Sequence, residues 1–167
     1  MKEFLPHEDL YLKTIELLND RGVTTKDIAK LVNQLQHEYF PNITDEECEF
    51  QVNKVLKKRE VQNAVITGIE LDILAEKKLL RSPLLEMLIH DDSLYGIDEV
   101  ISLSIVNVYG SIGFTNYGYI DKLKPGIIGE LNKHNNGQVN TFLDDVVGAI
   151  AAASSSRIAH NYDPYAH

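Results

Sequence analysis

The sequence predicts an all-α protein, a compact multi-helix bundle with one buried central helix. Apolar residues recur at helical spacing along most of the 167 residues. Helix start signals are frequent, and they include Thr24, Thr44 and the pair Ser82-Pro83. No segment alternates apolar and polar residues between turns, which is the pattern typical of a strand. A chain of this length with 44% hydrophobic residues can bury one core, so we expect residues 1–167 to form a single domain.

The N-terminal part is predicted to form three helices, at residues 10–18, 26–40 and 44–56. Gly22 is typical of a left-handed helix terminator. Thr24 or Thr25 offers the N-cap of the second helix, which stops before Pro41. Thr44 begins a capping box that opens the third helix, because a Glu follows three residues later.

The rest of the chain is predicted to form helices at residues 61–80, 84–90, 96–109, 127–134 and 140–160. Apolar residues cover nearly the whole circumference of 61–80, so we place this helix at the centre of the bundle. Residues 96–109 are apolar almost all round and are also expected to be buried. A glycine-punctuated aromatic stretch follows, and we expect residues 161–167 to be frayed.

Charge and cysteine content exclude several classes of function. The net charge of −9 argues against nucleic acid as a partner and disfavours an anionic membrane surface. Cys48 is the only cysteine, so an intrachain disulfide and a cysteine-based zinc site are excluded, and we expect a cytoplasmic location. The N-terminus lacks a signal-peptide pattern, and charge is expected to interrupt the apolar stretches before the roughly 20 residues of a membrane span.

Two pairs of acids stand at the start of apolar helices. Asp98 and Glu99 precede one of them, and Asp144 and Asp145 precede the last helix. A buried carboxylate is costly unless it is paired, protonated or bound to a cation. On a helical wheel, Asp144 and Asp145 project from the same side as Gly148 and several Ala and Ser residues, where another helix can approach closely. Carboxylates from two helices could therefore converge on Mg²⁺ or Mn²⁺ shared with a phosphate substrate. The alternative is that each pair only complements the helix dipole.

Two further residues, Glu70 and His90, are candidates for the same chemistry. Glu70 is a lesser candidate ligand, because Asp72 and Glu76 on the same helix could equally mark an exposed strip. His90 could act as a base or a ligand, or could complement the dipole of a short helix.

Lysines near the acids could neutralise a phosphate group. Lys122, Lys124 and Lys133 are the candidates, and Lys124 is preferred because it directly precedes Pro125. Cys48 lies in an acidic segment that would raise its thiol pKa, so it is a poor nucleophile. Attack by a metal-activated water is the better hypothesis.

Three segments, in this order and spacing, resemble the phosphatidylglycerophosphatase A family: HDDSLYGIDEV (90–100), FTNYGYIDKLKP (114–125) and FLDDVVGAIAAA (142–153). The resemblance covers residues 60–160 and is closest to the low-temperature-requirement-C-like branch, which leaves residues 1–58 outside it. It implies Mg²⁺-dependent hydrolysis of phosphatidylglycerophosphate to phosphatidylglycerol and phosphate. By position, Asp98, Glu99, Asp121, Asp144 and Asp145 would supply metal ligands and a base, with Lys124 facing the phosphate.

The chain departs from this family at two places. The glycine- and proline-rich N-terminal block of the membrane-embedded members has no counterpart here, and Gly118 stands where they carry an Arg. Because Arg is a planar phosphate clamp, a water-soluble phosphate ester or a lost activity stays an alternative.

Two other classes of function are kept open. One is an all-α nucleotide pyrophosphohydrolase, although Glu46, Glu47 and Glu49 do not reproduce its usual E-x-x-E spacing. The other is a helical interaction or cold-adaptation protein. Its small-residue last helix would pack within the protomer or against a second copy in a homo-oligomer.

Overall fold

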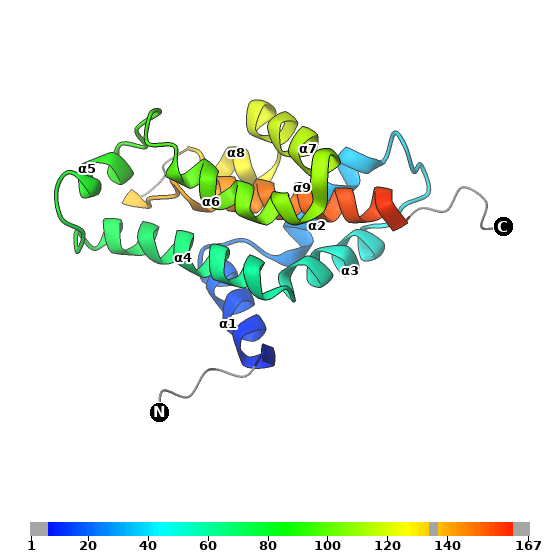
Figure 1. Cartoon of the computed structure of the whole chain (residues 1–167), viewed down its shortest axis with the longest axis horizontal. Coiled ribbons are helices and arrows are strands. Elements are labelled where there is room, and N and C mark those ends of the chain that lie inside the picture. Colours follow the sequence, from blue (N-terminus) through cyan, green and yellow to red (C-terminus); the bar gives the residue numbers. More distant parts are fainter. Residues whose placement is uncertain (1–6, 134–136, 162–167) are drawn as a thin grey trace.

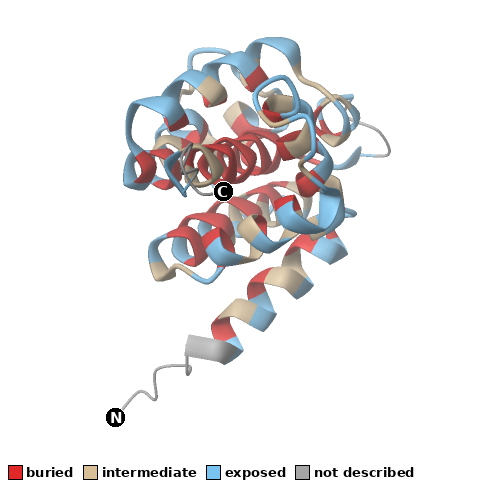
Figure 2. Cartoon of the chain, turned by 90° about the vertical axis from the view of Figure 1, so that its right-hand side faces the viewer, coloured by how far each residue is buried: buried red, intermediate tan, exposed pale blue. Residues whose placement is uncertain are grey.

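Helix α9 (Leu143–Asn161) runs through the middle of the molecule, and most of the other helices pack around it (Figure 1). The computed structural model describes residues 7–133 and 137–161. Residues 139–156 are all buried, and a view close to the axis of α9 shows the buried residues concentrated there (Figure 2). Helices α2, α3, α4, α6, α7 and α8 all contact α9. The predicted all-α fold is confirmed, since no strand occurs in the described ranges.

The N-terminal part consists of α1 (His7–Asp20), α2 (Thr25–Gln36), α3 (Asp45–Leu56) and α4 (Arg59–Glu76). The predicted start signals are confirmed. Thr24 accepts a hydrogen bond from the backbone N–H of Asp27, and Thr44 accepts one from that of Glu47, each within a capping box. Gly22 is left-handed with φ 80°, as a helix terminator requires.

The prediction that residues 61–80 form the central helix is wrong. Helix α4 ends at Glu76 and exposes Asn63, Thr67 and Glu70, which lie on one face at i, i+4 and i+7. The central helix is α9, whose Gly, Ala and Ser side chains make it narrower than α4. Small side chains allow several helices to approach one axis, and the hydrophobicity of the sequence does not report this.

The C-terminal part begins with α5 (Leu84–Ile89), and continues with α6 (Ile97–Val106), the 3₁₀ turn η1 (Asn107–Tyr109), α7 (Gly110–Leu123) and α8 (Ile127–Leu131). The predicted Ser cap of α5 is absent, because Pro83 occupies the N-cap position and no side chain caps the helix. The glycine-punctuated aromatic stretch forms α7. Residues 162–167, within the segment that was predicted to be frayed, lie outside the described residues.

Helices α6 and α7 are more exposed than the sequence suggested. On α6, Ser102, Ile105 and Val106 are buried, whereas Ile97 and Val100 are exposed. The expectation that charge interrupts every apolar stretch is wrong, since residues 100–120 contain no Asp, Glu, Lys or Arg. By length and composition, Ile97–Leu123 could cross a membrane. It is divided by η1 and both halves contact α9.

Candidate functional site

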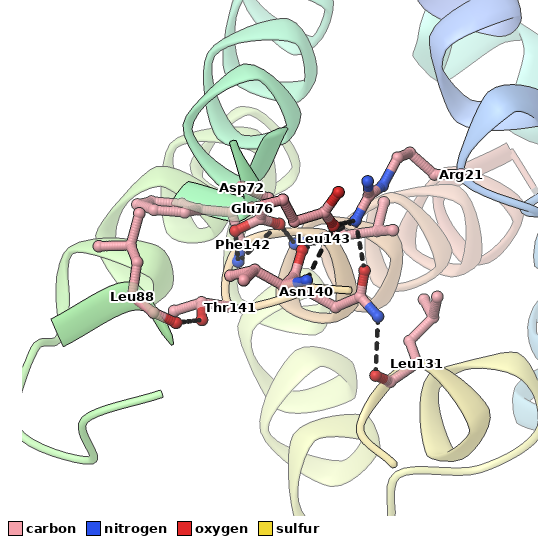
Figure 3. Close-up of polar contacts among 10 residues, drawn as sticks. Arg21, Asp72, Glu76, Leu88, Leu131, Asn140, Thr141, Phe142 and Leu143 are labelled. Carbon is pink, nitrogen blue, oxygen red and sulfur yellow. Dashed lines mark hydrogen bonds and ion pairs between the residues drawn. The ribbon is translucent and has the colours of Figure 1, made fainter. Parts of the chain in front are cut away.

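The start of α9 is held by a carboxylate from another helix. Asp72 of α4 accepts hydrogen bonds from the backbone N–H groups of Phe142 (3.1 Å) and Leu143 (2.9 Å), as Figure 3 shows. These donors lie at the N-terminus of α9, where they have no partner within the helix. Asp72 is fully buried, and burial raises the pKa of its carboxyl to about 8 against the opposing effect of the two N–H donors. Asp72 therefore fixes where α9 begins.

A second cluster holds the segment just before α9. The Arg21 guanidinium pairs with Glu76 and donates to the carbonyl of Val139 (2.8 Å) and to Asn140 Oδ1 (2.9 Å). Glu76 also accepts from the Val139 N–H at 2.8 Å, and Asn140 donates to the carbonyl of Leu131 (Figure 3). The interpretation of the α4 acids as an exposed strip is thus wrong for Asp72 and Glu76, which anchor the chain ahead of Asp144 and Asp145.

The acids of the two predicted pairs converge on one cleft of about 250 Å³. Its lining combines the loop before α6, the first turn of α6, the end of α7 and the start of α9. The carboxylates that line it are Asp91, Asp92, Asp98, Glu99, Asp121, Asp144 and Asp145, and Lys124 is the lysine among the lining residues. The cleft therefore has a large surplus of negative charge at neutral pH.

Lys124 lies among three of these carboxylates. Its Nζ is 2.7 Å from Asp121 Oδ1, 3.2 Å from Asp144 Oδ2 and 3.5 Å from Asp145 Oδ1. The residue is left-handed (φ 46°), a conformation that ends α7 and that few non-glycine residues adopt. Although burial lowers the pKa of Lys124, the charge of Asp144 and the contacts with the other two acids raise it above its usual value. Lys124 is the cation that these acids share.

The acids at the start of α9 remain incompletely neutralised. Burial and the charge of Asp144 raise the pKa of Asp145 to about 8, and burial raises the pKa of Asp144 to about 6 against the charge of Lys124. Burial also raises the pKa of Asp98. The Oδ1 atom of Asp98 is buried and has no hydrogen-bond partner among the described residues. Such a cluster favours uptake of protons or of another cation.

The small side of α9 permits this convergence, as the helical wheel predicted. A Cβ at Gly148 would lie 3.2 Å from Ile120 Cγ2 of α7 and 3.5 Å from Ile128 Cδ1 of α8. Glycine therefore lets α7 approach closely enough for Asp121 and Lys124 to reach the acids of α9.

The donor chemistry of the cleft suits a hard divalent cation. All the carboxylates offer oxygen, which Mg²⁺ and Mn²⁺ prefer, and the partnerless oxygen of Asp98 is available. Yet no three His, Cys, Asp or Glu side chains within the described ranges are arranged to hold a metal together. The position of Lys124 among Asp121, Asp144 and Asp145 accounts for this, since its ammonium stands where a shared cation would.

Other sequence candidates lie outside the cleft. His90 is exposed and lines a neighbouring depression with Glu86 and Met87. Lys122 and Lys133 are exposed and do not line the cleft, and Glu70 is exposed on α4. The structure thus does not bring these residues together with the acid pairs.

Five lining residues were not among the predicted site residues: Asp91, Asp92, Ser93, Gly96 and Asn132. Asp91 and Asp92 drew attention only as neighbours of His90, and Asn132 carried no signal. The available clue for Asp91 and Asp92 was their position: two consecutive acids shortly before a helix that begins with Asp98 and Glu99. Asn132 follows a short helix in a polar segment, so nothing in the sequence distinguished it.

The acids considered for a pyrophosphohydrolase are separate from the cleft. Glu46 and Glu47 line a larger groove of about 760 Å³ together with Tyr39 and Phe50. Glu47 also caps α3, while Glu49 accepts a hydrogen bond from the Thr25 hydroxyl at 2.6 Å. Glu47 and Glu49 therefore have structural partners, and Glu49 does not line the groove.

The thiol of Cys48 is a poor nucleophile in this structure. It is fully buried, and burial, followed by the charges of Asp45 and Glu47, raises its pKa to about 12. The predicted direction is confirmed, and burial is the larger cause.

An all-helical fold around a cleft of carboxylates and one lysine defines the class of protein: an α-helical bundle with an acidic cleft. The family follows from the sequence match. Residues 21–160 match the family described as Phosphatidylglycerophosphatase A, and the chain belongs to this family. The match begins at residue 21, so α2 and α3 are part of it, although the resemblance first suggested residue 60.

Relatives and solved structures extend the likeness over nearly the whole chain. The chain is similar to the uncharacterized Bacillus subtilis (strain 168) proteins YutG, with 63% identity over 86% of each chain, and YpjQ, with 54% identity over 97% of this chain and 90% of YpjQ. Among crystal structures, it resembles the low temperature requirement C protein from Listeria monocytogenes. That structure has 57% identity and a TM-score of 0.91, covering 94% of this chain and 99% of that one.

Proposed function

We propose that the chain is a Mg²⁺-dependent phosphomonoesterase that hydrolyses phosphatidylglycerophosphate to phosphatidylglycerol and phosphate in the acid cleft. The observation that carries the proposal is the convergence of carboxylates from α6, α7 and α9 around Lys124 in a member of this family. A cleft with this donor set and one lysine can hold a divalent cation and a phosphate group at the same time.

The residues of the cleft take the following roles. Asp98, Glu99, Asp121, Asp144 and Asp145 would hold the metal, and Mn²⁺ is the alternative ion. When bound, Mg²⁺ polarises a phosphoryl oxygen and lowers the pKa of a coordinated water. A carboxylate of this group that is left uncoordinated would take the proton from the attacking water.

Lys124 would exchange partners during the reaction. Its ammonium pairs with Asp121, Asp144 and Asp145, and a bound cation would repel it from them. A phosphate group entering the cleft would offer an alternative anionic partner. Lys124 would then stabilise the phosphate charge, while the acids coordinate the metal.

The substrate could also be a water-soluble phosphomonoester. Gly118, which replaces the Arg of membrane-embedded members, lies exposed on α7, so no guanidinium clamps the phosphate from this position. We place the protein in the cytoplasm and, for a lipid substrate, at the membrane surface. No observation favours assembly through the small-residue face of α9, because residues 143–156 are buried within the protomer.

The proposal is tested by phosphate release with variants inside and outside the cleft. Asp145→Asn and Asp98→Asn are expected to lower the Mg²⁺-dependent rate by about 100-fold or more, in line with loss of a group that acts on the reacting phosphate. Glu70→Gln is the matched control, because Glu70 is an exposed acid outside the cleft. Equal rates for wild type and both cleft variants, with folding intact, would contradict the proposal.

A further inference from the structure

The segment from α6 to α7 has an unusual composition for a surface segment. Charged residues make up 25% of the chain, yet residues 100–120 contain no Asp, Glu, Lys or Arg. Only 22% of the most apolar 18-residue stretch within Ile97–Leu123 is buried. An uncharged apolar segment of this length is normally buried in a protein core or in a bilayer. In this protomer most of the segment is not buried.

Seven of the thirteen exposed large hydrophobic side chains of the described residues lie in this segment. We call the following set the α6–α7 face: Ile97, Val100, Val108, Ile112, Phe114, Tyr119 and Leu123. The exposed fraction is 59% for Val100 and 56% for Tyr119. The opposite side of both helices is used for folding, since Ile105, Val106 and Ile120 are buried in the main core. The α6–α7 face is therefore left uncovered by the fold.

The apolar segment is not one continuous helix. The chain turns at η1, where Gly110 has φ 73°. A Cβ at Gly113 would lie 3.0 Å from Val106 Cγ1, so the end of α6 and the start of α7 pack directly together. A single continuous spanning helix is thus not formed, and α6 and α7 each leave apolar side chains exposed.

The two helices that carry the α6–α7 face also supply side chains to the acid cleft. The first turn of α6 supplies Asp98 and Glu99 to the cleft, while the end of α7 supplies Asp121 and Lys124. The exposed Ile97 and Leu123 are therefore next in sequence to the cleft residues Asp98 and Lys124. This arrangement fits a substrate with a phosphate head and apolar tails. A second copy of the chain on this face would stand beside the cleft, where substrate has to enter.

The end of α7 carries the side chains typical of a membrane interface. Tyr119 is amphipathic, and aromatic residues of this kind concentrate at the level of lipid headgroups. Lys122 is exposed next to Leu123, where a long side chain can reach a headgroup phosphate while its methylenes contact apolar surface. Lys122, which does not line the cleft, would have its phosphate contact here.

We propose that the α6–α7 face binds the surface of a lipid bilayer and thereby presents the acid cleft to phosphate headgroups. The orientation toward a lipid phosphomonoester rests on the proposed function, whereas the binding itself depends only on the face. Because binding is driven by apolar burial, and the net charge of −9 disfavours anionic surfaces, the chain is expected to bind zwitterionic vesicles with little dependence on salt.

The test is flotation of the full chain with phosphatidylcholine vesicles, without substrate or metal. Wild type is expected to float, and Tyr119→Asp to reduce partition by about tenfold or more, because a charge replaces an apolar ring that enters the interface. The matched control is Tyr39→Asp, at a tyrosine that is 74% exposed beside the separate groove. It is expected to float like wild type, as is Tyr119→Phe.

The inference would be overturned if folded wild type did not float, or if the Tyr119→Asp and Tyr39→Asp variants lost flotation equally. It would also be overturned if wild type did not float and instead formed a dimer that Tyr119→Asp converts to a monomer. The last outcome would make the face a contact between two copies. Hydrolysis of phosphatidylglycerophosphate in detergent micelles and of soluble phosphomonoesters, measured separately in Mg²⁺, keeps the two proposals apart. Flotation without hydrolysis contradicts the proposed function alone, and hydrolysis without flotation contradicts the docking face alone.

Discussion

The capping of α9 by Asp72 makes a quantitative prediction about stability. Asp72→Ala removes the acceptor for two buried backbone N–H groups, those of Phe142 and Leu143. Each buried donor left without a partner costs about 1–3 kcal/mol. Removing the buried carboxylate recovers part of the total cost for the two donors. We therefore expect the free energy of unfolding to fall by about 2–4 kcal/mol. Asp72→Asn keeps one acceptor oxygen of the same shape and is expected to cost about 1 kcal/mol.

Urea denaturation at neutral pH measures both variants, with Glu70→Gln as the control for an exposed acid on the same helix. The alanine variant is also expected to lose Mg²⁺-dependent activity, since Asp144 and Asp145 follow directly in α9. A loss of stability below about 0.5 kcal/mol for Asp72→Ala would refute the view that this carboxylate holds the helix start.

Three other predictions follow from the site. Asp72 and Asp145 have folded pKa values of about 8, above the unfolded value of 3.8, so the folded state holds protons that the unfolded state has released. Stability is therefore expected to fall as pH rises from about 5 to about 8, and thermal melts that show constant or rising stability over this range would contradict this. Lys124→Asn, a residue that tolerates the left-handed conformation, is expected to strengthen Mg²⁺ binding in calorimetry while lowering phosphate release, and weaker Mg²⁺ binding would contradict the partner exchange. Gly118→Arg is expected to stabilise α7 by about 0.5–1 kcal/mol, because no atom lies within 4 Å of the added Cβ, and a destabilised variant in urea would be the contrary result.

Much of the fold was predictable from local signals. Capping boxes at Thr24 and Thr44 and the terminator Gly22 act within a few residues, so the sequence reports them directly. The identity of the central helix was not predictable by hydrophobicity, because α9 is central through its small residues. Likewise, Asp72 looked like part of an exposed strip until the start of α9 was seen to pack against α4.

Part of the candidate site was predictable, because local patterns in the sequence report it. A pair of acids at the start of an apolar helix is a signal for a site, because burying a carboxylate costs free energy unless it has a partner. This signal identified Asp98, Asp144 and Asp145. The contacts of Lys124 with three acids depend on how α7 crosses α9, which no local pattern specifies. His90 and Lys122 neighbour cleft residues in sequence, but a side chain one or two positions along a turn or helix points elsewhere.

Phosphate release from phosphatidylglycerophosphate in detergent micelles, in Mg²⁺ and in EDTA, tests the central claim most directly. Soluble phosphomonoesters measured in parallel separate the lipid from other substrates. We predict release that requires Mg²⁺ and is abolished by Asp145→Asn. The absence of release from every phosphomonoester by folded, Mg²⁺-supplied protein would contradict the account and leave the acid cleft without the proposed chemistry.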